Sequence, residues 1–91
     1  MTCALIAIVE ATDTARAGEL RDRLETEIIP RTKAVPGFQK GYWFADTENE
    51  RAGAVVLLFE SEEAAHSAPA PPSDAPVKVH SRALYRLVAE A

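Results

Sequence analysis

The sequence predicts a small α+β protein with the element order β-α-β-β-α-β. Residues 3–9 and 54–59 are unbroken apolar runs of strand length, which indicates strands that are buried on both faces. Between them, residues 14–34 place apolar side chains at spacings of three and four, with charged side chains in between, the pattern of an amphipathic helix. Residues 77–88 alternate apolar and polar side chains, which is typical of a strand with one buried face.

The first helix is expected to begin after the turn that follows the first strand. Asp13 or Thr14 can cap it, because either side chain can accept a hydrogen bond from a free N–H of the first turn. Pro30 removes one backbone hydrogen bond, but Val35 stays in phase with the apolar stripe, so we expect a kinked helix that ends near Ala34. The stripe itself consists of Ala17, Leu20, Leu24 and Ile28.

The second and third strands are expected to form a hairpin. Residues 38–46 are rich in aromatic side chains, residues 47–50 form a polar tip, and residues 51–59 contain the second apolar run. Ser61 then caps a short helix that ends near Ser67, because a proline follows two residues later.

The connection from the short helix to the last strand is stiff and extended, because it contains Pro69, Pro71, Pro72 and Pro76. Together with the short helix it predicts that residues 61–76 form a weakly protected lid over apolar side chains of the second and third strands. Under strict alternation, one face of the last strand carries Lys78, His80, Arg82 and Arg86. We interpret them as a charged edge that resists edge-to-edge pairing, with a carboxylate or phosphate site as the alternative.

The order of the strands follows from the handedness of the crossovers. A right-handed crossover places the first and third strands in the centre of one antiparallel sheet, in the order 4-1-3-2. The helices then cover one face, and the other face exposes apolar side chains of the central strands. A chain of 91 residues forms one domain, 1–91, with a thin core, so we expect a homodimer through this open face. Either Val56 or Leu57 points into that interface.

Composition excludes several kinds of partner and site. The net charge of −4 argues against nucleic acid and against an anionic membrane surface. Cys3 is the only cysteine and is interpreted as a small buried hydrophobe, and the two histidines have no metal-ligand spacing, so we expect no disulfide and no metal. The apolar N-terminus is interpreted as a strand, not as a signal peptide, and no run approaches the roughly 20 residues of a membrane span. We therefore expect a cytoplasmic protein.

Two stretches resemble a known superfamily. Val35, Pro36, Gly37 and Phe38, followed by Gly41, Tyr42 and Trp43, resemble the dimeric α+β barrel superfamily, and so does the stretch FESEEA at residues 59–64. Within it, the chain is most similar to small stand-alone proteins related to antibiotic-biosynthesis monooxygenases. The resemblance implies a ferredoxin-like fold, a dimeric α+β barrel, and a pocket between the sheet and the helices of each subunit.

The resemblance also implies a catalytic set that this chain does not retain. Catalytic members, including haem-degrading and quinone-forming ones, use an asparagine of the first strand, a tryptophan at the end of the third strand and a histidine on the second helix. Here the only asparagine, Asn49, lies in the hairpin tip, Phe59 stands at the tryptophan position, and His66 alone remains. We therefore expect no catalytic residue, no cofactor and no haem degradation.

The candidate ligand-binding residues are Trp43, Phe59 and His66. Trp43 could line a pocket or pack in the core or an interface, and His66 could meet a ligand's polar edge or be a surface residue. The sequence thus predicts a homodimer that binds a small apolar or aromatic molecule between sheet and helices. The alternative is a cofactor-independent monooxygenase or cyclase acting on an aromatic polyketide-like substrate. In such an enzyme the substrate itself, and not a cofactor, carries out the chemistry with oxygen.

Overall fold

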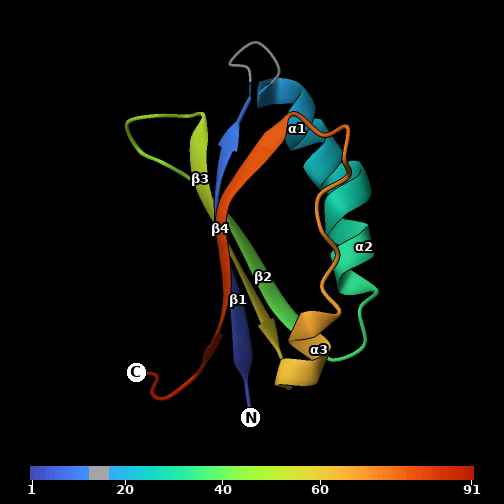
Figure 1. The fold of residues 1–91 in the computed structure, drawn as a ribbon, viewed down its shortest axis with the longest axis vertical. Helices are drawn as coiled ribbons and strands as arrows, with labels where there is room; N and C mark the ends of the chain where they lie inside the picture. The colour runs from blue at the N-terminus through green and yellow to red at the C-terminus, as the bar shows by residue number, and fades with distance from the viewer. Residues whose placement is uncertain (13–16) are drawn as a thin grey trace.

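The computed structural model describes residues 1–12 and 17–91, and its strands form a four-stranded antiparallel sheet (Figure 1). The strands are β1 (Cys3–Ala11), β2 (Phe38–Ala45), β3 (Ala52–Phe59) and β4 (Val77–Arg86), in the order β2-β3-β1-β4. This confirms the predicted β-α-β-β-α-β topology and the sheet order. Each strand begins and ends within two residues of its predicted bounds.

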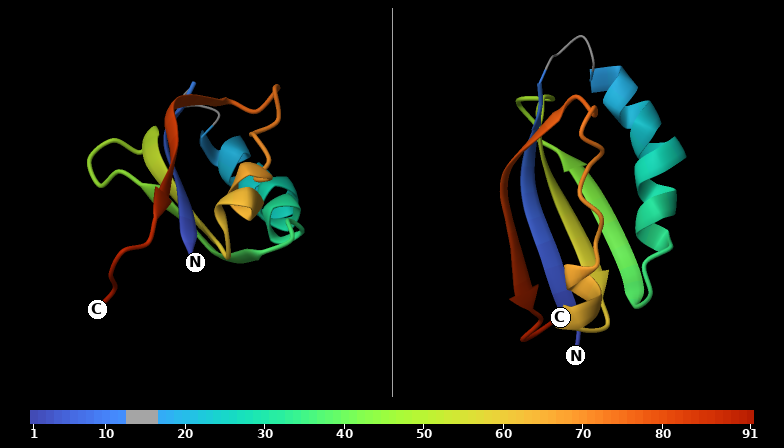
Figure 2. Two further views of the ribbon diagram at one scale, coloured as in Figure 1. Left: turned by 60° about the horizontal axis from the view of Figure 1, so that its bottom comes forward. Right: turned by 45° about the vertical axis from the view of Figure 1, so that its right-hand side comes forward.

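The long helix passes along one face of the sheet in three consecutive segments (Figure 2). These are α1 (Ala17–Arg23), a π-helical turn (Leu24–Ile28) and α2 (Ile29–Lys33). The kink expected at Pro30 takes the form of this wider turn, in which the Ile29 N–H donates to the Leu24 carbonyl five residues earlier. Pro30, which has no N–H to donate, follows two residues after the end of this turn, and the helix continues past it. The predicted caps, Asp13 and Thr14, lie outside the described residues.

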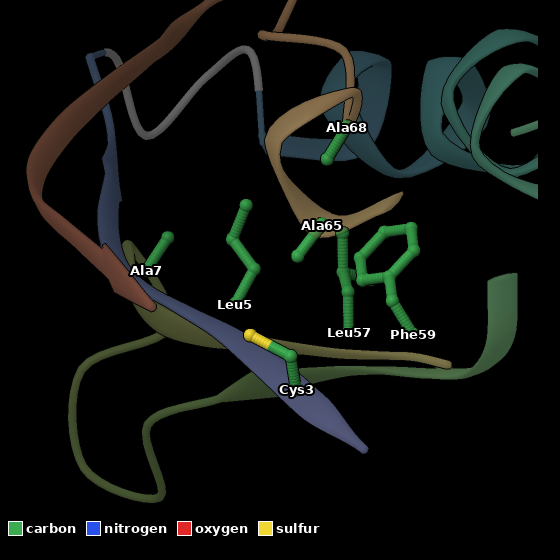
Figure 3. Close-up of a cluster of buried hydrophobic side chains, with 7 residues drawn as sticks. All are labelled: Cys3, Leu5, Ala7, Leu57, Phe59, Ala65 and Ala68. Carbon is green, nitrogen blue, oxygen red and sulfur yellow. The ribbon is translucent and has the colours of Figure 1, made fainter. Parts of the chain in front are cut away.

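The short helix α3 (Glu62–His66) closes one end of the core. The Ser61 side chain caps it as predicted, accepting a hydrogen bond from the Ala64 N–H at 3.1 Å. Figure 3 shows the buried cluster, in which side chains of β1 and β3 meet side chains from α3 and the residues after it: Cys3, Leu5, Ala7, Leu57, Phe59, Ala65 and Ala68. The prediction that Cys3 is a buried small hydrophobe is confirmed. Among the described residues, no helix has the length and apolar character needed to cross a bilayer.

The two faces of the sheet differ sharply in what covers them. The face toward the helices contributes the strand residues of the buried cluster, and no helix covers the other, open face in the part of the chain that the structure describes (Figure 2). Val56 is paired with Ile6 and Tyr42 and belongs to the open face, whereas its neighbour Leu57 is buried toward the helices. The open face exposes large apolar side chains, including Ile8, Tyr42, Phe44 and Tyr85.

Strict alternation is wrong for β4, because the strand contains a bulge. Ile8 is paired with Ser81 and Val9 with Val79, so His80 is an extra residue. An extra residue reverses the alternation beyond it. Lys78 therefore lies opposite Glu10 on the open face. Arg82 lies opposite Ala7 and Arg86 opposite Cys3, both on the face toward the helices, so the four residues Lys78, His80, Arg82 and Arg86 do not share one face.

Candidate functional site

A cavity of about 550 Å³ lies between the sheet and the layer of helices. Its floor is the helix-facing surface of β1 and β3, with Leu5, Val9 and Leu57 among its apolar side chains. The long helix forms one wall, and the proline-rich connection contributes Pro69 and Pro72 to another. A volume of this size is within the range of small-molecule sites, which are mostly apolar concave spaces.

One row of cross-strand partners runs across the floor of the cavity from edge to edge. Trp43 of β2 lies opposite Val55 of β3, Val55 lies opposite Ala7 of β1, and Ala7 lies opposite Arg82 of β4. All four residues line the cavity. Neighbouring strands are about 4.8 Å apart, so the backbones at the two ends of the row are separated by roughly 14 Å. The cavity thus has an aromatic edge and a cationic edge, with small apolar side chains between them.

A glycine two residues before Trp43 determines how the indole lies. A Cβ added at Gly41 would be 2.9 Å from Cη2 of Trp43 and 3.0 Å from Cδ2 of Leu57. Since residues two apart on a strand share a face, the ring extends back along β2 over the space that a side chain at Gly41 would fill. The absence of a side chain at Gly41 therefore leaves room for the indole of Trp43 at the edge of the cavity.

The guanidinium of Arg82 joins the opposite edge to the connection. It donates to the Ala68 carbonyl at 3.3 Å, and no carboxylate of the described residues forms a salt bridge with it. Arg51, at the start of the hairpin's second arm, bonds through Nε to the Ala11 carbonyl at 3.2 Å and through a terminal nitrogen to the Thr12 carbonyl at 3.5 Å. A backbone carbonyl carries no net charge, so the bond to Ala68 leaves the charge of the Arg82 guanidinium without a compensating acid among the described residues.

Charge on the cavity walls is unlike that of the chain as a whole. Among the described lining residues the cations are Arg21, Arg31, Arg51 and Arg82, and the one acid is Glu50, which gives a formal charge of +3. The complete chain carries −4. The described residues contain no group of three His, Cys, Asp or Glu side chains that could hold a metal ion. The site is therefore suited to an organic ligand with an anionic group more than to a metal.

The structure separates the three candidate residues of the sequence analysis. Trp43 lines the cavity. Phe59 has no exposed surface and packs edge to face against Phe38, with ring centroids 5.7 Å apart, in the core below α3. The His66 side chain is 67% exposed, 3.6 Å from Glu62, and is not on the cavity wall. Ligand binding by these three residues stays a prediction.

Local packing explains why His66 lies away from the cavity and why Arg82 lines it. Ala65 is the residue of α3 that enters the core, and its neighbour consequently points into solvent. Arg82 enters the cavity wall because of the bulge at His80. A regular alternating pattern gives no signal for one extra residue, so sequence reasoning placed Arg82 on a solvated edge.

The proline-rich connection is attached to the rest of the molecule at a few points. Asp74 forms a salt bridge with Arg23 at 3.1 Å, and Arg23 also bonds to Glu27 at 2.9 Å. Hydrogen bonds to Asp74 and Glu27 raise the pKa of Arg23. The Pro76 carbonyl accepts from the Thr12 N–H at 3.0 Å. These contacts hold residues 69–76 beside the long helix and over the cavity.

Comparison with known proteins supports the fold. No protein-family model matches the chain, and no curated protein matches it. Among solved structures, it is similar to the crystal structure of a candidate antibiotic biosynthesis monooxygenase from Bacteroides thetaiotaomicron VPI-5482. The two share 19% sequence identity with a TM-score of 0.65, over 96% of this chain and 89% of that one. The chain therefore shares its ferredoxin-like fold with that protein.

Proposed function

We propose that the protein is a small homodimer that binds a small apolar or aromatic molecule in the cavity between its sheet and its helices. The observation that carries this proposal is the position of Trp43 at the edge of an apolar floor formed by Ala7 and Val55. An aromatic ring beside small apolar side chains provides a flat surface against which another ring can stack. The burial of Phe59 and the exposure of His66 support binding without the catalytic set of the family.

The dimer is proposed to form through the open face of the sheet. Tyr42 and Phe44 stack on this face with ring centroids 6.2 Å apart, and Phe44 is 56% exposed. Tyr85 and Ile8 extend the apolar surface onto β4 and β1. A second copy of the same face would remove these side chains from water, at a gain of about 25 cal/mol per Å² of apolar surface.

Fluorescence of the single tryptophan tests ligand binding. Trp43 is the only tryptophan, so energy transfer from it reports on the cavity itself. Phenylnaphthylamine, a neutral aromatic amine that fluoresces in apolar surroundings, should bind saturably with transfer from Trp43. Val55→Phe, which fills the floor, should weaken binding strongly, and the neighbouring Val56→Phe on the open face should not. Equal binding by the two variants would refute the cavity as the site.

A cofactor-independent monooxygenase or cyclase acting on an aromatic polyketide-like substrate is the second candidate function. The observation in its favour is the similarity of the fold to a candidate antibiotic biosynthesis monooxygenase. Oxygen uptake with anthrone as the test substrate separates the two functions. Under the binding proposal, the protein consumes oxygen no faster than its Val55→Phe variant. A faster, Val55-dependent uptake would favour the enzyme.

A further inference from the structure

The arginines of the cavity are more than ordinary surface charges on this chain. Four of its ten basic residues, Arg21, Arg31, Arg51 and Arg82, line this one cavity, opposed by a single described acid, Glu50. In an acidic chain, a concave site of opposite sign attracts and concentrates anions. The surrounding apolar surface strengthens this attraction, because it keeps part of the water away.

Arginine pairs with acids on this chain where acids are in reach. Arg23, on the same helix as Arg21, bonds to both Glu27 and Asp74. Arg82 has only the Ala68 carbonyl as a described partner. A guanidinium has five N–H donors, so Arg82 retains donors for a further acceptor. An oxyanion that accepts two parallel N–H bonds is the group that fits this geometry best.

The row from Trp43 to Arg82 specifies how such a ligand would lie. Trp43 places an aromatic ring at one edge and Arg82 places a cation at the other, with Val55 and Ala7 between them. We propose that the ligand is an aromatic acid whose rings lie against Trp43 and whose anionic group pairs with Arg82. This inference rests on the proposed function and deepens it by naming the class of ligand.

Two fluorescent probes with the same aromatic skeleton test the inference. Anilinonaphthalenesulfonate carries a sulfonate that phenylnaphthylamine lacks, so the ratio of their dissociation constants isolates the anionic group. In Arg82→Gln, binding of the sulfonate should weaken about tenfold, the lower end for a hydrogen bond to a charged group, because Arg82 is exposed to solvent. Binding of the neutral probe should not change. Added salt should weaken the binding of the sulfonate probe and leave the binding of the neutral probe unchanged.

Arg86→Gln is the matched control. It removes the same charge from the same strand and the same face, four residues along and outside the cavity. The inference is supported if Arg82→Gln changes the probe ratio and Arg86→Gln does not. It is overturned if both variants change the ratio equally, or if Arg82→Gln weakens both probes alike. If the neutral probe binds in the Val55-dependent manner but the sulfonate shows no Arg82 dependence, the aromatic acid is wrong and the proposed function stands. If neither probe binds, both are wrong.

Discussion

Trp43 and Arg82 end one row of cross-strand partners that spans the whole sheet, Trp43 on edge strand β2 and Arg82 on edge strand β4. The residues between them, Val55 and Ala7, are smaller than both. The two edges therefore rise above the centre of the floor, and the cavity between sheet and helices has two chemically different ends. The proposed aromatic acid depends on both ends of this row, whereas the proposed binding of an apolar or aromatic molecule depends on the Trp43 end alone.

The first prediction concerns the residue that makes room for the indole. Gly41→Ala should displace the Trp43 ring, because the new Cβ would lie 2.9 Å from Cη2 of that ring. Forcing a methyl group into a packed site costs about 1–3 kcal/mol, and we expect a loss of that order in the free energy of unfolding. A shift in the Trp43 emission maximum and weaker phenylnaphthylamine binding should accompany it.

Gly18→Ala is the control for that substitution. Gly18 lies in α1, and apart from its chain neighbours and the nearby helix backbone no described atom lies within 4 Å of a Cβ placed there. Alanine should stabilise this helix by about 0.5–1 kcal/mol and leave the Trp43 emission unchanged. Denaturant unfolding of the two variants gives the comparison. A stabilised Gly41→Ala protein with unshifted emission would show that the indole does not need the space.

The sequence predicts the fold, but it does not predict that Arg82 lines the cavity or that His66 lies away from it, because both depend on details that a local pattern does not contain. Periodicity is a local signal, and it located the strands and the long helix, while the handedness of crossovers then ordered the sheet. Arg82 faces the cavity because His80 is an extra residue in β4. Nothing in the order of apolar and polar residues along the strand marks His80 as a bulge. The direction of His66 depends on which side of the five-residue helix α3 packs on the core. Ala65 packs there with Phe59, so His66 lies on the solvent side.

The second prediction tests the proposed dimer. Light scattering after gel filtration should give about twice the 9.9 kDa mass of the chain. Phe44→Glu places a charge on the open face and should yield a folded monomer, because burying an unpaired carboxylate in an interface is costly. Val88→Glu adds the same charge at a residue that is 86% exposed beyond β4, and should remain dimeric. A monomeric native chain would end the proposal.

The third prediction concerns the lid. Hydrogen exchange should be fastest in residues 69–74, where no backbone N–H donates to the sheet in the described structure. The sequence alone predicts equally fast exchange in residues 61–68. In the structure Ala65 and Ala68 belong to the core, so intermediate protection is expected there. Bound phenylnaphthylamine should slow exchange in 69–74 more than in the hairpin tip, 46–50. Protection of 69–74 equal to that of β1 in the empty protein would argue against a lid.

The last prediction concerns the contact between Glu10 and His80, the extra residue of the bulge in β4. The hydrogen bond between His80 and Glu10, at 3.0 Å, lowers the pKa of the Glu10 carboxyl below its ordinary value of 4.5, and the positive charges of His80, Arg51 and Lys78 act in the same direction. A carboxyl with a lowered pKa in the folded state stabilises that state above pH 4.5 and loses this contribution as the pH falls through the folded-state value.

Thermal melts of the native chain and Glu10→Gln as a function of pH measure this contribution. The native chain should melt at the higher temperature above pH 4.5, and the two curves should converge in strong acid, where both side chains are neutral. Glu90→Gln removes a carboxylate from the exposed C-terminal residues beyond β4 and should follow the native chain at every pH. A difference between native protein and Glu10→Gln that persists unchanged in strong acid would mean that the ion pair at the bulge does not support the fold.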